Sequence, residues 1–116
     1  WDVPWGIDEW LLGALVTGAR GAVGSSYNFA APLYHGLLAA FERGDLAAAR
    51  AAQLRSTQLI ALLARHGYMG AAKATMAMLG VDVGPARLPN GSVTTEQART
   101  LRSELEALGF FDWIRL

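Results

Sequence analysis

The first 26 residues have the order strand, helix, strand, and this order most constrains what the chain can fold into. WDVPWG reads as a short strand that ends at Gly6, and GAVGSS reads as a second, buried parallel strand. Between them, the run from Leu11 to Val16 has helical spacing, and Gly18 follows it. Two parallel strands cannot form a covered sheet. They therefore need further strands, either from another chain or from a segment that precedes Trp1.

The rest of the chain predicts helices only. Apolar residues recur at helical spacing over residues 30–43, between Asp45 and Gly67, over residues 71–79 and over residues 95–108. Asp45 is suited to cap the second of these helices, and the spacing of Thr94 and Gln97 predicts a capping box for the last. The stretch VDVGPARLPNGS is rich in proline and glycine, so it predicts an extended connection.

The composition limits the classes of function. The chain has 116 residues, 53% of them hydrophobic, with 10 Lys and Arg against 10 Asp and Glu. This balance is too apolar for disorder and too neutral to suggest a nucleic-acid partner, and charges interrupt every candidate membrane span. The absence of cysteine fits a cytoplasmic protein. Because so short a domain buries little surface, the high apolar fraction predicts a piece of a longer protein.

Polar side chains follow both predicted strands. Gly6, Asp8 and Glu9 follow the first strand, and Ser25 follows the second. The C-terminal ends of parallel strands share one edge, where such folds bind ligands, and hydroxyls with two carboxylates suit a neutral polyhydroxyl ligand. A structural role also stays open, with Asp8 as a helix cap, Glu9 complementing the helix dipole and Ser25 satisfying a turn.

Two segments carry a resemblance to a known family. GIDEWLLGALVTGARGAVGSSYN and GYMGAAKATMAMLGVDVGPARLP are similar to the C-terminal part of the aldolases of the dihydrodipicolinate synthase and N-acetylneuraminate lyase family. The similarity runs through essentially the whole chain. Gly6 with Asp8 and Glu9, and the string from Gly24 to Asn28, resemble the sialic acid lyase branch more than the dihydrodipicolinate branch.

The resemblance implies the fold class. Members of this family fold as an eight-stranded α/β barrel (TIM barrel) followed by C-terminal helices. Residues 1–29 are then expected to be the last two barrel strands with their connecting helix, and residues 30–116 the C-terminal helices of the same barrel protein. The partner strands would lie in a missing N-terminal barrel segment.

The resemblance also implies a function. It is that of a class I aldolase, a cytoplasmic lyase of carbohydrate metabolism and a homotetramer, which cleaves N-acetylneuraminate to N-acetylmannosamine and pyruvate through a lysine Schiff base without a cofactor. In the family, this lysine and a proton-relaying tyrosine lie on earlier strands, so the chain alone is expected to hold no catalytic residue and to be inactive. Motif matching assigns binding of the sugar hydroxyls to Gly6, Asp8, Glu9 and Ser25. Ser26 stands where many relatives have threonine.

Three isolated side chains invite a different interpretation. Lys73 is the only lysine, but it lies within a predicted helix far from any strand end, so we expect a structural role. His35 and His66 have no second ligand at a suitable spacing, and no metal is expected. Two other functions stay open: another pyruvate-dependent aldolase or synthase of the same family, acting on a related 2-keto-3-deoxy sugar acid, and a non-catalytic helical interaction module.

Overall fold

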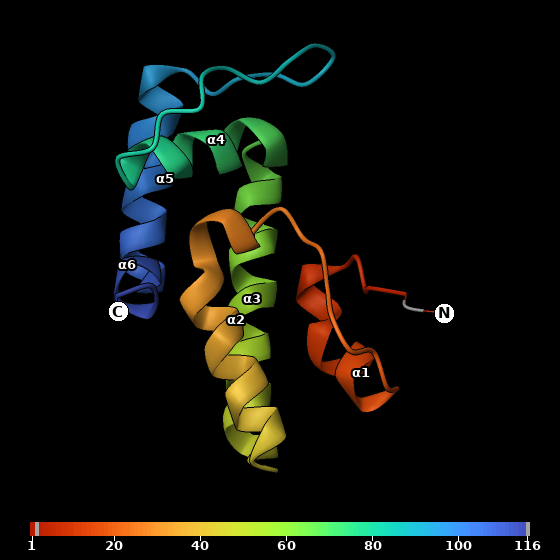
Figure 1. Ribbon diagram of the computed structural model, residues 1–116. Helices are drawn as coiled ribbons and strands as arrows, with labels where there is room; N and C mark the ends of the chain where they lie inside the picture. Colours follow the sequence, from red (N-terminus) through yellow and green to blue (C-terminus); the bar gives the residue numbers. More distant parts are fainter. Residues whose placement is uncertain (2, 116) are drawn as a thin grey trace. The chain divides into compact units, whose positions relative to one another are not determined.

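The computed structural model describes Trp1 and residues 3–115. The chain divides into two compact units, which Figure 1 shows in sequence colours: unit 1 is Trp1–Gln58 with Ile114–Leu116, and unit 2 is Leu59–Trp113. The predicted division into residues 1–29 and 30–116 separates barrel strands from C-terminal helices. A division by compactness does not test it.

Unit 1 begins with a 3-10 turn (Asp8–Trp10) and the helices α1 (Leu11–Val16) and α2 (Tyr27–Glu42). The first part of α3 (Leu46–Arg65) completes it. The predicted cap of α3 is confirmed, because the Ala48 N–H donates to Asp45 Oδ1 at 3.0 Å.

Helix α2 starts three residues earlier than predicted and is kinked. Ala30 has a non-helical φ of −128°, and Pro32 lies two residues further on. A proline inside a helix has no N–H to donate and its ring clashes with the preceding turn, which accounts for the kink.

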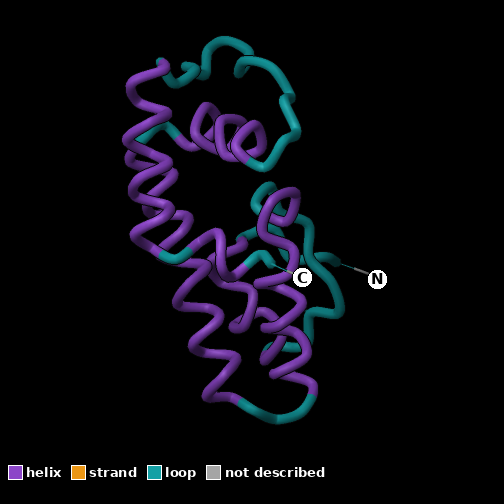
Figure 2. The backbone as a smooth tube through the Cα atoms, turned by 90° about the vertical axis from the view of Figure 1, so that its left-hand side faces the viewer, coloured by secondary structure: helices purple, strands orange, loops and turns teal. Residues whose placement is uncertain are grey.

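The two predicted strands are not formed among the described residues, and Figure 2 draws both segments as loops. Asp2, within the first of them, lies outside the described residues. One parallel bridge joins Trp5 and Ala22, in which the Trp5 N–H donates to Gly21 O at 2.9 Å and the Val23 N–H to Trp5 O at 2.8 Å. The segments therefore pair in the parallel sense expected. A pair without further neighbours is marginal, so the expected strands shrink to a bridge.

Unit 2 holds the end of α3 with α4 (Tyr68–Met78), α5 (Thr95–Leu108) and the short α6 (Phe110–Trp113), which was not predicted. The capping box is confirmed: the Gln97 N–H donates to Thr94 Oγ1 at 3.2 Å, and the Thr94 N–H donates to Gln97 Oε1 at 2.8 Å. Gly109 ends α5 in the left-handed conformation with a φ of 82°. Residues 81–92 form a connection without helix or strand, as predicted, but it is not extended throughout, because residues 88–90 form a turn.

The core of each unit is apolar, but unit 1 also buries polar side chains. Asp8, Ser26 and Ser56 are buried in unit 1, whereas Thr75 is the buried polar side chain of unit 2 among the described residues. Within the described part of the chain, no helix is long and apolar enough to cross a membrane. The buried apolar residues include, in unit 1, Leu11, Phe29, Leu33 and Leu37 and, in unit 2, Leu59, Leu63, Leu101, Leu105 and Phe110.

Candidate functional site

The structure places Asp8 against the turn that follows the second predicted strand. Asp8 Oδ2 accepts the Ser26 N–H at 3.0 Å and also accepts the Ser26 hydroxyl. Gly24 lies beside the same carboxylate, since a Cβ atom added there would stand 2.5 Å from Asp8 Cγ. The ends of the two predicted strands therefore meet at Asp8, as the order of the elements indicates.

Asp8 does not act as a helix cap, and this sequence-based alternative is wrong. Neither the 3-10 turn nor α1 has a cap hydrogen bond from the side chain of its own N-cap residue. The first turn of α1 is instead capped from α3, because the Leu12 N–H donates to Gln53 Oε1 at 2.7 Å. The carboxylate of Asp8 is thus occupied by Ser26 rather than by helix donors.

The other three predicted binding residues are more accessible than Asp8. Gly6 and Ser25 are exposed and Glu9 is half-buried, whereas Asp8 is only 5% exposed. The turn that carries Ser25 is closed by Asn28, whose Nδ2 donates to the Ser25 carbonyl at 2.9 Å. The structure thus brings Asp8 to this turn and leaves Gly6, Glu9 and Ser25 open to solvent.

A closed chain of hydrogen bonds runs from the side chain of Asp8 back to its own carbonyl, and we call it the Asp8 ring. From Ser26, the chain continues to the Tyr34 hydroxyl, with Oγ and OH 2.6 Å apart, and from there to Ser56 Oγ at 2.9 Å. Ser56 Oγ lies 3.3 Å from the Asp8 carbonyl, to which it donates. All four members are buried, with Tyr34 3% exposed and both serines 0%.

Sequence reasoning did not find Tyr34, Gln53 or Ser56. Tyr34 lies among the apolar positions of α2, where an aromatic residue predicts ordinary core packing. A signal existed on α3, because Gln53 and Ser56 are three residues apart and so share one helical face. Ser56 is buried and Gln53 half-buried, and a polar side chain in such a position predicts a partner, although the sequence does not identify it.

Tyr27 lies beside the ring but takes no part in it. Its ring packs edge-on against Tyr34 with centroids 4.4 Å apart, and its buried hydroxyl has no hydrogen-bond partner among the described residues. Burial raises the pKa of this hydroxyl well above its ordinary value, and the Asp8 carboxylate raises it further. Tyr27 therefore keeps its proton at neutral pH and is unsuited to act as a base.

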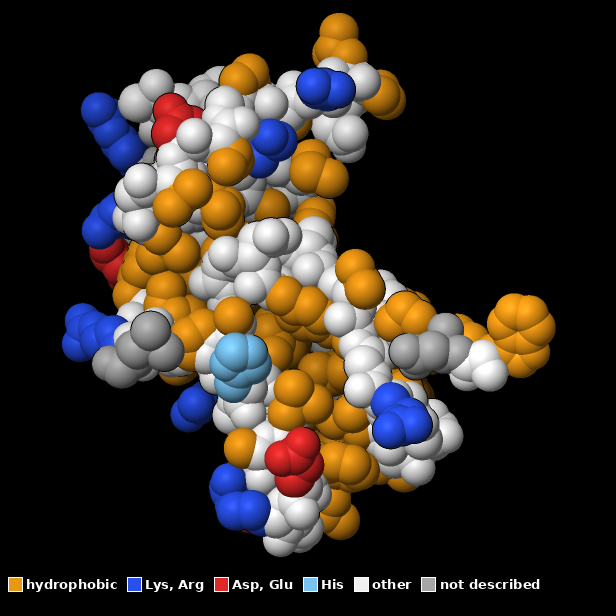
Figure 3. All heavy atoms as spheres, in the orientation of Figure 1, with side chains coloured by type: hydrophobic (Ala, Val, Ile, Leu, Met, Phe, Trp, Pro, Cys, Tyr) orange, Lys and Arg blue, Asp and Glu red, His pale blue; other side chains and the backbone are white. Residues whose placement is uncertain are grey.

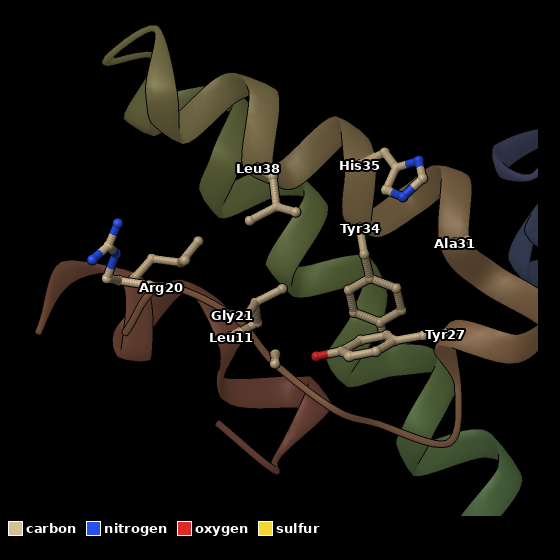
Figure 4. Close-up of a pocket in the computed structure, with 10 residues that line it drawn as sticks. Leu11, Arg20, Gly21, Tyr27, Ala31, Tyr34, His35 and Leu38 are labelled. Carbon is tan, nitrogen blue, oxygen red and sulfur yellow. The ribbon is translucent and has the colours of Figure 1, made fainter. Parts of the chain in front are cut away.

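A mainly apolar cavity of about 220 Å³ lies in unit 1 next to the Asp8 ring, since Tyr34 belongs to both. Figure 4 shows it between α1, α2 and the segment at Arg20 and Gly21, with Tyr27 and Tyr34 on one wall and His35 at the side. Gly6, Asp8, Glu9 and Ser25 do not line it, so we assign it no part in substrate binding.

Several charged side chains of unit 2 have structural partners. Lys73 Nζ donates to the Val83 carbonyl at 3.2 Å and so ties α4 to the extended connection. Glu104 Oε2 lies 3.1 Å from Arg65 Nη2 and 3.0 Å from His66 Nε2. Sequence spacing could not show this cluster, because 38 residues separate His66 from Glu104. The described residues contain no group of three side chains that could hold a metal ion.

Comparisons with known proteins show the family to which the chain belongs. The family model of the dihydrodipicolinate synthetase family matches residues 3–108. An N-acetylneuraminate lyase from Rattus norvegicus is 39% identical over 110 residues, which cover 93% of this chain and 34% of the relative. The corresponding lyase from Mus musculus is 40% identical over 90% of this chain and 33% of its own length. The chain thus spans about a third of the length of these relatives.

Solved structures give the same result. The N-acetylneuraminate lyase (sialic acid aldolase) from Aliivibrio salmonicida matches with a TM-score of 0.88 and 38% identity, covering 95% of this chain and 37% of that one. A crystal structure of a putative dihydrodipicolinate synthetase from Pseudomonas aeruginosa matches with a TM-score of 0.77 and 35% identity. That match covers 91% of this chain and 37% of the other.

Proposed function

The chain belongs to the dihydrodipicolinate synthetase family, and from this premise we propose that it forms the sugar-binding side of a class I aldolase. In this proposal, the full-length enzyme cleaves N-acetylneuraminate to N-acetylmannosamine and pyruvate. The names of the relatives support the reaction, and one geometric observation carries the assignment to this region. Asp8 meets the turn of Gly24 and Ser26, where the two predicted strands end.

We assign the sugar hydroxyls to Gly6, Asp8, Glu9 and Ser25. The exposure of Gly6 and Ser25 and the partial exposure of Glu9 support this assignment. Ser26 occupies Oδ2 of Asp8 and Gly24 packs against Oδ1, so the proposal assigns the sugar hydroxyl to the carboxylate of Asp8 without choosing one oxygen. Two carboxylates suit hydroxyl donors because hydrogen bonds to an ionised acceptor are stronger than neutral ones.

The covalent chemistry belongs to other parts of the full-length enzyme. A lysine amine condenses with the keto carbon, and the resulting iminium accepts the electron pair when the carbon–carbon bond breaks. Lys73 is not proposed for this step, because its Nζ donates to a backbone carbonyl within unit 2. The contribution of this chain is then to orient the sugar end of the substrate.

Exposed apolar side chains in the first 23 residues support the proposal that further parts of the full-length protein pack against this chain. Figure 3 shows that hydrophobic side chains reach the surface over much of the face that it draws. We propose that the remaining barrel strands of the full-length enzyme cover the exposed side chains of these first residues. We also propose that this enzyme is a cytoplasmic homotetramer, and sedimentation tests its oligomeric state. The exposed residues are Trp1, Val3, Ile7, Trp10, Val16 and Val23.

A paired assay on the full-length enzyme tests the proposed function. Cleavage of N-acetylneuraminate reports the sugar end, and borohydride reduction with pyruvate followed by mass spectrometry reports the Schiff base. We expect both activities, with the adduct on a lysine outside this chain. An adduct on Lys73 contradicts the proposal, and so does absence of cleavage. The match to a putative dihydrodipicolinate synthetase favours one alternative, an aldolase or synthase for another 2-keto acid, so related acids are assayed in parallel.

A further inference from the structure

We propose that Tyr34 and Ser56 are positioning residues that hold the sugar-binding groups of this enzyme in place. The inference rests on the proposed function and extends it to two residues of α2 and α3 that no motif identifies. The observation that supports it is the closed Asp8 ring, which starts at Oδ2 of Asp8 and returns to the carbonyl of the same residue.

The ring fixes Asp8 at two points. Its carboxylate is held by the Ser26 N–H and hydroxyl, and its carbonyl by Ser56. Gln53 adds a weaker contact to the same carbonyl, with Nε2 3.4 Å away. A residue held at both main chain and side chain has little freedom to turn its carboxylate away from a ligand. Tyr34 links the two points, because its hydroxyl contacts both Ser26 and Ser56.

The same contacts fix the turn that carries Ser25. Ser26 is completely buried and its N–H and hydroxyl both bond to Asp8, while Gly24 packs against that carboxylate. Ser25 stands between these two anchored residues. Its position therefore follows that of Asp8, and the ring couples the two predicted sugar contacts.

The number of protons gives the ring a direction. Three hydroxyls supply three protons for four contacts, and both ends of the chain at Asp8 are acceptors when the carboxylate is ionised. The carboxylate takes the Ser26 proton, Ser26 then accepts from Tyr34, and Tyr34 accepts from Ser56. The single Ser56 proton is shared between the Tyr34 hydroxyl and the Asp8 carbonyl. The contact to the carbonyl, at 3.3 Å, is the longest of the ring, and Gln53 Nε2 donates to the same carbonyl. The hydroxyls thus point toward the carboxylate and stabilise its charge.

The test uses Tyr34→Phe and Ser56→Ala in the full-length enzyme. Both variants keep the packing but remove a link, so we expect kcat/KM for N-acetylneuraminate to fall by roughly tenfold, mainly through KM. Borohydride trapping with pyruvate is expected to stay within about twofold of wild type. The double variant should lose no more than about the larger single effect, because both substitutions open one ring.

Two matched controls separate positioning from general damage. Tyr27→Phe removes a buried hydroxyl beside the ring that has no partner among the described residues, so we expect wild-type kinetics. Ser26→Thr keeps the ring hydroxyl and should retain more cleavage than Ser26→Ala. This pair of variants also tests the inference if Tyr34→Phe does not fold. If folded Tyr34→Phe and Ser56→Ala cleave as well as wild type, the inference is overturned but the proposed function is not. Equal loss of cleavage and trapping has the same consequence. A wild-type enzyme that does not cleave N-acetylneuraminate overturns the proposed function, and the inference falls with it.

Discussion

Units 1 and 2 satisfy their buried polar groups over different distances in the sequence. In unit 1, Asp8 bonds to Ser26 and Ser56, which are 18 and 48 residues away. In unit 2, the Thr75 hydroxyl donates to the Ala71 carbonyl at 2.9 Å, four residues back in its own helix. The buried polar side chain of unit 2 is therefore satisfied within its own helix, whereas those of unit 1 need partners that only the folded chain brings together.

This difference predicts where substitutions are most harmful. A buried polar group that loses its partner costs about 1–3 kcal/mol, whereas a hydroxyl bonded within its own helix is cheaply replaced. Changes at Asp8 and Gly24 should accordingly disturb both stability and function, while changes at buried and surface polar residues of unit 2 should disturb stability only slightly.

The largest effect is expected for Gly24→Ala. Because the new Cβ would collide with the Asp8 carboxylate, we expect a loss of roughly 3 kcal/mol in the free energy of unfolding, at the upper end of the cost of overpacking. Chemical denaturation of the full-length protein measures it. Gly21→Ala is the control, since its Cβ would meet nothing within 4 Å. Equal stability of the two variants would show that the close packing of Gly24 against Asp8 does not contribute to stability.

Asp8→Asn is expected to act on the sugar end of the reaction. The amide keeps the shape but loses the charge-assisted part of the bonds, worth roughly 1–3 kcal/mol, so kcat/KM for N-acetylneuraminate should fall about ten- to a hundredfold. Trapping of pyruvate should persist. Steady-state kinetics and borohydride trapping are compared after the melting temperature is checked. If neither activity is lost, Asp8 is not a binding residue. If both are lost equally, the substitution has damaged the whole protein.

Thr75→Val tests the opposite side of the comparison. Its buried hydroxyl is replaced by a methyl group of similar size, and the lost bond is to a carbonyl of the same helix. We expect the free energy of unfolding to change by less than about 1 kcal/mol. A loss as large as that of Gly24→Ala would show that unit 2 also depends critically on a buried polar contact.

The smallest effect is expected at Glu104 on the surface of unit 2. Hydrogen bonds from His66 and Arg65 hold the pKa of this carboxyl below its ordinary value of 4.5. Because the folded-state pKa is the lower one, the contribution to stability is fully present above pH 4.5 and is lost as the pH falls through the folded-state pKa. Melting temperatures measured from pH 6 downward should therefore decline less for Glu104→Gln than for wild type, and the difference should shrink in high salt. Parallel profiles would show that the cluster contributes nothing.

How much the sequence predicts follows the same division. The capping box of Thr94 and the cap at Asp45 were predictable because each joins residues at most three apart. The family resemblance and the parallel sense of the Trp5 and Ala22 bridge were predictable from motif and element order. The binding roles of Gly6, Asp8, Glu9 and Ser25 stay predictions.

The features that the sequence did not reveal depend on distant or missing neighbours. Ser26 as the partner of the Asp8 carboxylate could not be inferred, because a capping role fits the same local spacing equally well. The Tyr34 and Ser56 link joins two helices through residues 22 positions apart. The expected strands are reduced to a bridge, since strand formation depends on neighbours that the pattern of one segment does not contain.

The cap that Gln53 provides to α1 has a consequence for the order of folding. Helix α1 has six residues, too few to be stable alone in water, and its Leu12 N–H is satisfied from a residue 41 positions later. During synthesis, the segment of α1 must therefore wait for α3 to emerge before it can reach its final structure. We expect the residues of α1 to remain open to proteases in nascent chains that stop short of Gln53 and to become protected once α3 has emerged.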